Sequence, residues 1–131
     1  MGAAGTDRLL ELAHRLRSAL LPHRDGGRVF AGTFVRQSNT LAFGEAAICA
    51  ALASGVPDSE AALAAFSVQY YVLGFVIEEQ AAKENADRGE DRGEVDAERF
   101  PRVAAGSRTL RNTPRDVQFA YGLDRLVASL R

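Results

Sequence analysis

The stretch SVQYYVLGFVIEEQ, residues 67–80, decides the fold class. Its apolar residues would lie on nearly every side of a helix, and this character ends within one turn at Glu78, Glu79 and Gln80. A helix that is apolar all round is either buried on several sides or spans a membrane. The stretch is shorter than the roughly 20 residues that cross a bilayer, and acids flank it. We therefore expect a helix buried within protein and no membrane partner.

The composition indicates one intracellular domain over residues 1–131. Lys and Arg number 16 against 17 Asp and Glu, so composition forces no basic face of the kind that binds nucleic acid. The single cysteine, Cys49, cannot form an internal disulfide and is typical of a small buried helical residue. The N-terminus lacks the apolar segment of a signal peptide, which favours a cytoplasmic chain.

Residues 6–22 have the apolar spacing of an amphipathic helix. Leucines recur along one side of it, at Leu9, Leu12, Leu16 and Leu20. Thr6 or Asp7 can cap its first turn, because a short side-chain oxygen accepts from free backbone amides, and Pro22 ends it. The following RVFAGTFV, residues 28–35, is consistent with either a strand or a short helix.

Two more helices are predicted next. Ser38 or Asn39 can cap the first of them, and it closes at Gly55. Pro57 suits the first turn of a long helix over residues 57–82, because its missing amide would be unpaired there anyway. At 1.5 Å per residue this helix would be about 38 Å long, which is unusual for so small a domain.

The remaining third of the chain is more polar. Residues 83–97 carry charge at most positions and one large apolar residue, Val95, so they predict a frayed helix end and a mobile loop. Pro101 is expected to interrupt the weaker helix that follows. The last helix is predicted over residues 114–130, with Pro114 at its first position after a threonine cap.

The long helix and the last helix are too widely apolar for one small domain to cover. Pairing both with their copies would bury them in a four-helix bundle across a two-fold axis, so a homodimer is predicted. Gly74 and Gly122 lie in mid-helix, where glycine costs about 1 kcal/mol against alanine, and they would allow close approach of helices. The predicted interface residues are Tyr71, Gly74, Phe75, Phe119, Gly122, Leu123, Leu126 and Val127.

The segments ALLPHRDGGRVFAGT, ASGVPDSEAALAAFSVQYYVLGFVIEEQAA, RFPRVAAG and FAYGLDRLVASL occur in this order along the chain. In this they resemble the C-terminal domain of tetracycline-repressor (TetR) family regulators, over about residues 9–130. The resemblance implies an all-α, effector-binding and dimer-forming domain, in which RVFAGT is a short helix. The family's helix-turn-helix DNA reader is a separate N-terminal part, and MGAAGTD leads straight into the effector domain. We therefore expect no direct DNA binding by this chain alone.

The resemblance also bears on the ligand. In the tetracycline-binding branch, an Asn and a Phe on the first helix of this domain, and a His and an Arg flanking LGT, bind a magnesium–drug complex. The matching positions here are Leu12, Leu16, Phe30 and Phe34. Thr33 is kept, and so are Glu78 and Gln80, whose counterparts in the family include the acid that reaches the metal's water shell from the partner chain. Without the imidazole, Mg²⁺ has lost its one direct protein ligand, and we expect no metal site and an apolar or aromatic metabolite or antibiotic.

Polar residues near the predicted pocket have two interpretations. Gln69 and Tyr70 either contact a ligand or find backbone partners, since buried polar groups need them. Asn39 is either a helix cap or a pocket contact, and His23 and Asp25 are expected to hold a turn. The full predicted ligand set is Leu12, Leu16, Phe30, Thr33, Phe34, Asn39, Leu41, Phe43, Phe66, Gln69, Tyr70 and Glu78.

The predicted function is that of a homodimeric effector-binding domain of a TetR-like repressor, without catalytic residues or cofactor. The high Ala, Arg and Gly content is typical of a GC-rich bacterial genome. Two alternatives stay open. A pocket with Gln69, Tyr70 and Glu78 could run acid–base isomerisation or cyclisation, although no phosphate loop or metal-spaced cluster is visible. A ligand carrier, or a partner that forms mixed dimers with a related regulator, is the other.

Overall fold

The computed structural model describes residues 2–27, 38–89 and 94–130. In these ranges the chain forms helices and no strand, which confirms the all-α prediction. The helices are α1 (Ala3–Leu20), α3 (Ser38–Ala53), α4 (Ala61–Asp87), α5 (Pro101–Arg111) and α6 (Arg115–Ala128). The segment RVFAGTFV, with Phe30, Thr33 and Phe34, lies outside the described residues, so the choice between strand and helix there stays a prediction.

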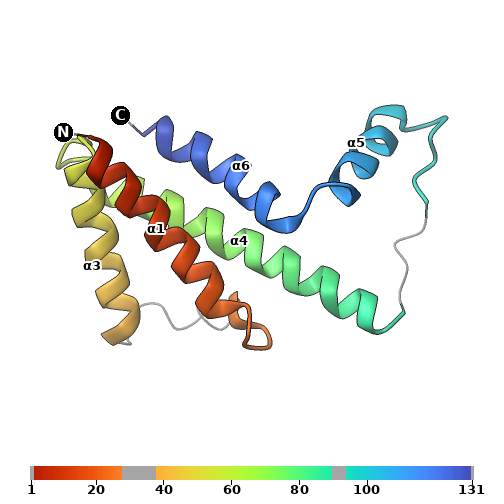
Figure 1. Cartoon of the computed structure of the whole chain (residues 1–131), viewed down its shortest axis with the longest axis horizontal. Coiled ribbons are helices and arrows are strands. Elements are labelled where there is room, and N and C mark those ends of the chain that lie inside the picture. Colours follow the sequence, from red (N-terminus) through yellow and green to blue (C-terminus); the bar gives the residue numbers. More distant parts are fainter. Residues whose placement is uncertain (1, 28–37, 90–93, 131) are drawn as a thin grey trace.

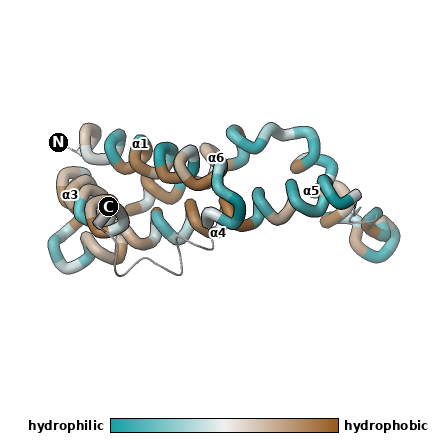
Figure 2. Tube along the Cα trace, turned by 90° about the horizontal axis from the view of Figure 1, so that it is seen from below, coloured by the Kyte–Doolittle hydropathy of each residue, from teal (hydrophilic) through white to brown (hydrophobic). Residues whose placement is uncertain are grey.

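The helix α4 is the axis of the fold (Figure 1). Helices α1 and α3 pack against each other and against α4, and α6 packs across α1 and α4. Helix α5 lies at the far end, beyond the contacts among the other four helices. Figure 2 shows apolar residues along α1, α3 and α4 and mainly hydrophilic residues on α5. The core therefore sits at the end of the molecule that holds α1 and α3.

Helical periodicity explains how the core is filled. The four leucines predicted on one side of the first helix are all buried. In α6 the buried residues are Phe119, Leu123 and Val127, spaced four apart, and they face α1 and α4. Helix α4 contributes buried residues along most of its apolar half, including the completely buried Val72 and Val76. Each such side chain adds roughly 1.5–3 kcal/mol of apolar burial.

Both ends of α4 differ from the prediction. The helix begins at Ala61 rather than at Pro57, because Pro57 and Glu60 close a separate turn through the Glu60 amide and the Pro57 carbonyl, 2.9 Å apart. It continues to Asp87, five residues beyond residue 82, since residues 83–87 contain no glycine or proline. It ends before Gly89, whose φ of +71° suits glycine.

Three other predicted boundaries are also wrong. Helix α1 begins at Ala3, so Thr6 lies inside it, and its hydroxyl donates to the Gly2 carbonyl at 2.9 Å instead of capping. Pro101 begins α5 rather than interrupting it. Pro114 is the residue before α6, which runs only to Ala128.

Helix α4 is the longest of the described helices. Its 27 residues are long and apolar enough to cross a membrane by length and composition alone, which the sequence interpretation denied. In the structure, α1, α3 and α6 all pack against it. This is the arrangement of a core helix in a folded domain.

Candidate functional site

The predicted ligand residues fall into separate places. Phe66 and Gln69 lie three residues apart on one side of α4, followed by Leu73, and this side turns inward. Phe43 of α3 is half-buried against the same core. Three- and four-residue spacing puts such side chains one above the other on a helix. They form the described part of the predicted ligand site, and the side chain of Asn39 lies outside the described residues.

The other described residues of the predicted ligand set are not assembled there. Leu12 and Leu16 are core residues of α1, buried to 94% each. Leu41, Tyr70 and Glu78 are exposed, and Tyr70 retains 65% of its surface. The acid–base set of Gln69, Tyr70 and Glu78 is therefore divided between the inside and the outside of α4, which weakens the enzymatic alternative.

Gln80 performs a role that sequence reasoning did not assign. Its side-chain Nε2 donates to the carbonyls of His23 at 2.8 Å and Leu20 at 3.3 Å, and its Oε1 accepts from the Gly27 amide at 3.3 Å. One glutamine thus satisfies three backbone groups of the turn after α1. His23 and Asp25 belong to this turn, and Asp25 has a positive φ of 54°. The turn was predicted, but the glutamine that supports it was not.

An open cavity of about 380 Å³ lies between this turn and the last part of α4. Residues 21–25 form one wall and a face of α4 from Gln80 to Arg88 forms the other. Its charged side chains carry both signs, with Arg24, Lys83 and Arg88 against Asp25, Glu84 and Asp87. None of the predicted ligand residues that the structure describes lines it.

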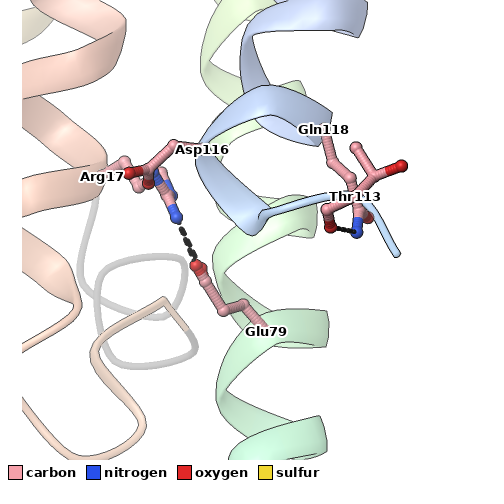
Figure 3. Close-up of polar contacts among 5 residues, drawn as sticks. All are labelled: Arg17, Glu79, Thr113, Asp116 and Gln118. Carbon is pink, nitrogen blue, oxygen red and sulfur yellow. Dashed lines mark hydrogen bonds and ion pairs between the residues drawn. The ribbon is translucent and has the colours of Figure 1, made fainter. Parts of the chain in front are cut away.

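Arg17 connects three helices (Figure 3). Its Nη2 lies 2.5 and 2.9 Å from the two carboxylate oxygens of Glu79 on α4, and its Nη1 lies 2.7 Å from Asp116 Oδ1 on α6. The guanidinium also packs over the rings of Phe75 and Phe119, 5.5 and 5.0 Å from their centroids. Burial alone lowers the pKa of Arg17, but the hydrogen bonds and charges of both acids raise it above its ordinary value. The group is therefore a permanent cation.

A second link joins α4 to α6. The Tyr71 hydroxyl donates to the Phe119 carbonyl at 2.8 Å, and burial raises the pKa of this phenol. The ring lies directly on Gly122, where an added Cβ would clash with the Tyr71 hydroxyl. The close helix approach expected of Gly122 is therefore made within one chain, to α4.

The predicted interface residues mostly lie inside the chain. Three of them, Phe119, Leu123 and Val127, are completely or nearly completely buried. Three more are half-buried and pack against the core, namely Tyr71, Phe75 and Leu126. Only Gly74 faces open space, and an added Cβ there would meet nothing within 4 Å. The core residues offer almost no surface to a second copy.

Other residues of the same two helices do face outward. Leu63 and Tyr70 of α4 are each more than half exposed, as are Val117 and Tyr121 of α6. We call these four residues the outer apolar surface. Hydrophobic periodicity identified both helices as widely apolar, but it could not tell which side faces the chain's own core.

The fold agrees with a comparison to known families. The model of the tetracycline-repressor-like C-terminal domain matches residues 3–131. The chain belongs to this family. Membership in this family agrees with the all-α fold predicted from the sequence. The C-terminal domains of TetR regulators are their ligand-binding and dimerisation parts.

Individual relatives support the assignment. The class G tetracycline repressor of Vibrio anguillarum is 36% identical over 124 residues, covering 92% of this chain and 57% of the relative. The class A repressor from transposon 1721 of Escherichia coli is 33% identical over 125 residues, covering 93% and 56%. A crystal structure of a possible TetR family transcriptional regulator from Streptomyces coelicolor A3(2) matches with a TM-score of 0.84 at 36% identity, covering 97% of this chain and 64% of that one. This TetR domain thus spans little more than half the length of its curated relatives.

Proposed function

We propose that this chain is the dimerising, effector-binding domain of a TetR-like transcriptional repressor that acts in a bacterial cytoplasm. Its effector is an apolar or aromatic metabolite or antibiotic rather than a magnesium–tetracycline complex. The observation that carries the proposal is the outer apolar surface on two neighbouring helices of a domain from this family.

The dimer is argued from uncovered apolar area. Helices α4 and α6 contact each other, and each presents two large apolar side chains to solvent. Contiguous apolar patches on small domains mark interaction sites, and a two-fold axis along α4 and α6 would cover them with a second copy. Gly74, which is open on this side of α4, would let the copies approach closely. Helix α5 also lacks cover, because Val103 and Leu110 are more than half exposed and only Ala104 is buried.

The ligand class is argued from the residues at the matching positions. The relatives are named for tetracycline, whereas Leu12 and Leu16 here are buried hydrocarbon side chains. Neither can bind a hydrated magnesium ion, which prefers oxygen ligands. Phe30 and Phe34, at the other two positions, lie outside the described residues. The exchange of polar for apolar residues favours a flat, apolar effector.

The coupling between effector and dimer would run through α1. This helix carries Leu12 and Leu16 and, one residue later, the Arg17 that joins α4 and α6. An effector that prefers one position of α1 would thereby prefer one arrangement of the dimer helices, and that difference in affinity is what shifts a regulator between states.

The decisive experiment measures association and ligand choice on the same protein. Sedimentation velocity from about 0.1 to 50 µM, a range spanning common dimer affinities, should give a dimer that dissociates when Tyr121 is replaced by glutamate. Thermal shifts should be larger with flat apolar aromatics than with tetracycline and Mg²⁺. A chain that stays monomeric throughout refutes the dimer, and tight binding of magnesium–tetracycline refutes the ligand class.

A further inference from the structure

Helix α5 and its flanks form the basic part of the chain. Residues 99–115 contain no acid and five arginines, namely Arg99, Arg102, Arg108, Arg111 and Arg115. The rest of the chain has the opposite balance, with 11 Lys and Arg against 17 Asp and Glu. All five arginines are exposed, and none forms an ion pair with a residue that the structure describes. Their charge is therefore not used to hold the fold together.

An exposed apolar stripe runs along the same helix. Phe100, just before its first residue, retains 46% of its surface, and Val103 and Leu110 retain 56% and 58%. Together with Ser107 they recur at spacings of three, four and three residues, the pattern of a seam that packs against one other helix. We call these four residues the α5 stripe. Within the described part of the chain, no element covers its three large side chains.

Helix α5 has a defined position relative to α6. The Gln118 side chain of α6 donates to the carbonyls of Leu110 at 3.0 Å and of Thr113 at 2.9 Å, and Figure 3 shows the second of these bonds. The Thr113 hydroxyl donates in turn to the Thr109 carbonyl at 2.7 Å, and Ala104 is buried. These contacts preorganise the α5 stripe, which lowers the entropy cost of binding a partner.

Charge and geometry together restrict the kind of partner. At 3.6 residues per turn, Arg102 lies on one side of the α5 stripe and Arg111 on the other. A complementary surface has apolar side chains along its middle and acids along both edges, which describes an acidic amphipathic helix. An anionic bilayer or a nucleic acid fits less well, because its negative charge extends beyond α5 and would meet the excess acids of the rest of the chain.

We propose that α5 is a docking helix for a partner protein, and that the partner's contact segment is an acidic amphipathic helix. The apolar residues of that segment cover Phe100, Val103 and Leu110, and its carboxylates pair with Arg102 and Arg111. The apolar centre supplies most of the affinity, while the exposed ion pairs set the choice of partner and the rate of association. This inference is independent of the effector site, since α5 lies beyond the contacts among the other four helices.

The test uses the whole 131-residue chain and a fluorescein-labelled peptide with three repeats of Glu-Leu-Ala-Ala-Leu-Glu-Ala. This probe places leucines along one side of a helix and glutamates at both edges. A second peptide with glutamine in place of every glutamate is its neutral control. In fluorescence anisotropy the glutamate peptide should bind at least about tenfold more tightly at low salt, and the difference should shrink as salt screens the ion pairs.

Substitutions in the chain locate the binding. Arg102→Glu/Arg111→Glu should weaken binding of the glutamate peptide at least about tenfold, and so should Leu110→Asn, which removes an exposed apolar side chain without entering the core. Arg24→Glu/Arg88→Glu is the matched control, because it changes the net charge equally at exposed positions outside α5. It should keep the affinity within about twofold. Equal weakening by both double variants would mean a general charge effect and would contradict the proposal.

Other results also overturn it. Equal affinity for the two peptides, or no binding of either, excludes an acidic helix as the occupant of α5. Binding to phosphatidylglycerol vesicles without binding to the glutamate peptide makes the occupant a lipid surface. Sedimentation velocity tests the remaining occupant: if Leu110→Asn dissociates a dimer of the chain, a second copy covers the α5 stripe. A dimer that survives Leu110→Asn while the peptide is lost supports docking of a separate protein.

Discussion

Replacing Arg17 by methionine removes the cation that joins α1, α4 and α6 while keeping an apolar side chain against Phe75 and Phe119. The perturbation leaves Glu79, whose side chain is only 12% exposed, without its partner. Removing one member of a buried ion pair costs 3–5 kcal/mol. Because both side chains keep about a tenth of their surface in water, we expect the free energy of unfolding to fall by about 2–4 kcal/mol.

The assay is urea unfolding followed by circular dichroism at one fixed protein concentration, since the proposed dimer would make stability concentration-dependent. The double variant Arg17→Met/Glu79→Gln leaves no buried charge unpaired, so it should recover more than half of the loss. Asp116→Asn is the matched control, because the Asp116 side chain is 88% exposed and exposed pairs contribute at most about 1 kcal/mol. If Asp116→Asn lowers the free energy of unfolding as much as Arg17→Met, or if the double variant recovers none of the loss, the buried Arg17–Glu79 ion pair is not the source of the stabilisation.

Four further substitutions test the α4–α6 contact and the outer apolar surface. Tyr71→Phe should cost about 0.5–1.5 kcal/mol through the lost hydrogen bond. Burial raises the pKa of Tyr71 in the folded protein, so the stabilisation by this hydrogen bond is complete below about pH 10 and is lost as pH rises through the raised pKa. Absorbance at 295 nm should show one late-titrating tyrosine in the wild type that the variant lacks. Gly122→Ala should lower the free energy of unfolding by about 1–3 kcal/mol, because the added methyl group pushes the Tyr71 ring away. Gly74→Ala meets no neighbour, so in chemical unfolding at high dilution it should leave the stability of the single chain unchanged or raise it by about 1 kcal/mol. Tyr121→Glu should weaken self-association at least about tenfold in sedimentation equilibrium and leave the circular dichroism spectrum unchanged, and an unaltered dimer would exclude α6 from the interface.

Local patterns predicted the features of the fold that depend on local chemistry. The leucine spacing of residues 9–20 identified the buried side of α1, and the apolar length of residues 67–80 identified a core helix. Helix ends were less predictable because competing local hydrogen bonds decide them. The Thr6 hydroxyl, for example, bonds back to the Gly2 carbonyl within a helix that starts earlier.

The candidate site was only partly predictable for a different reason. Gln69 was noticed because a polar group in an apolar helix needs a partner. Arg17 was not, because its acid partners lie 62 and 99 positions away, and no spacing within α1 signals them. The outer apolar surface was also missed, since periodicity gives the apolar sides of a helix without saying which neighbour covers each of them.

Helix α4 carries inward-facing core residues and, on its other side, the exposed Leu63 and Tyr70, so it links the proposed effector site to the proposed dimer surface. Helices α1, α3 and α6 cover the inward sides of α4, whereas Leu63 and Tyr70 are exposed and belong to the surface that we propose for the dimer. The same helix carries Gln69 toward the inside, one position away from Tyr70 on the outside. A rotation or shift of α4 that improves contact with an effector must therefore move the outer surface with it, because a helix transmits such motions as a rigid element. Arg17 would then determine how far α1 and α6 follow, and removing it should leave effector binding and dimer geometry less strongly coupled.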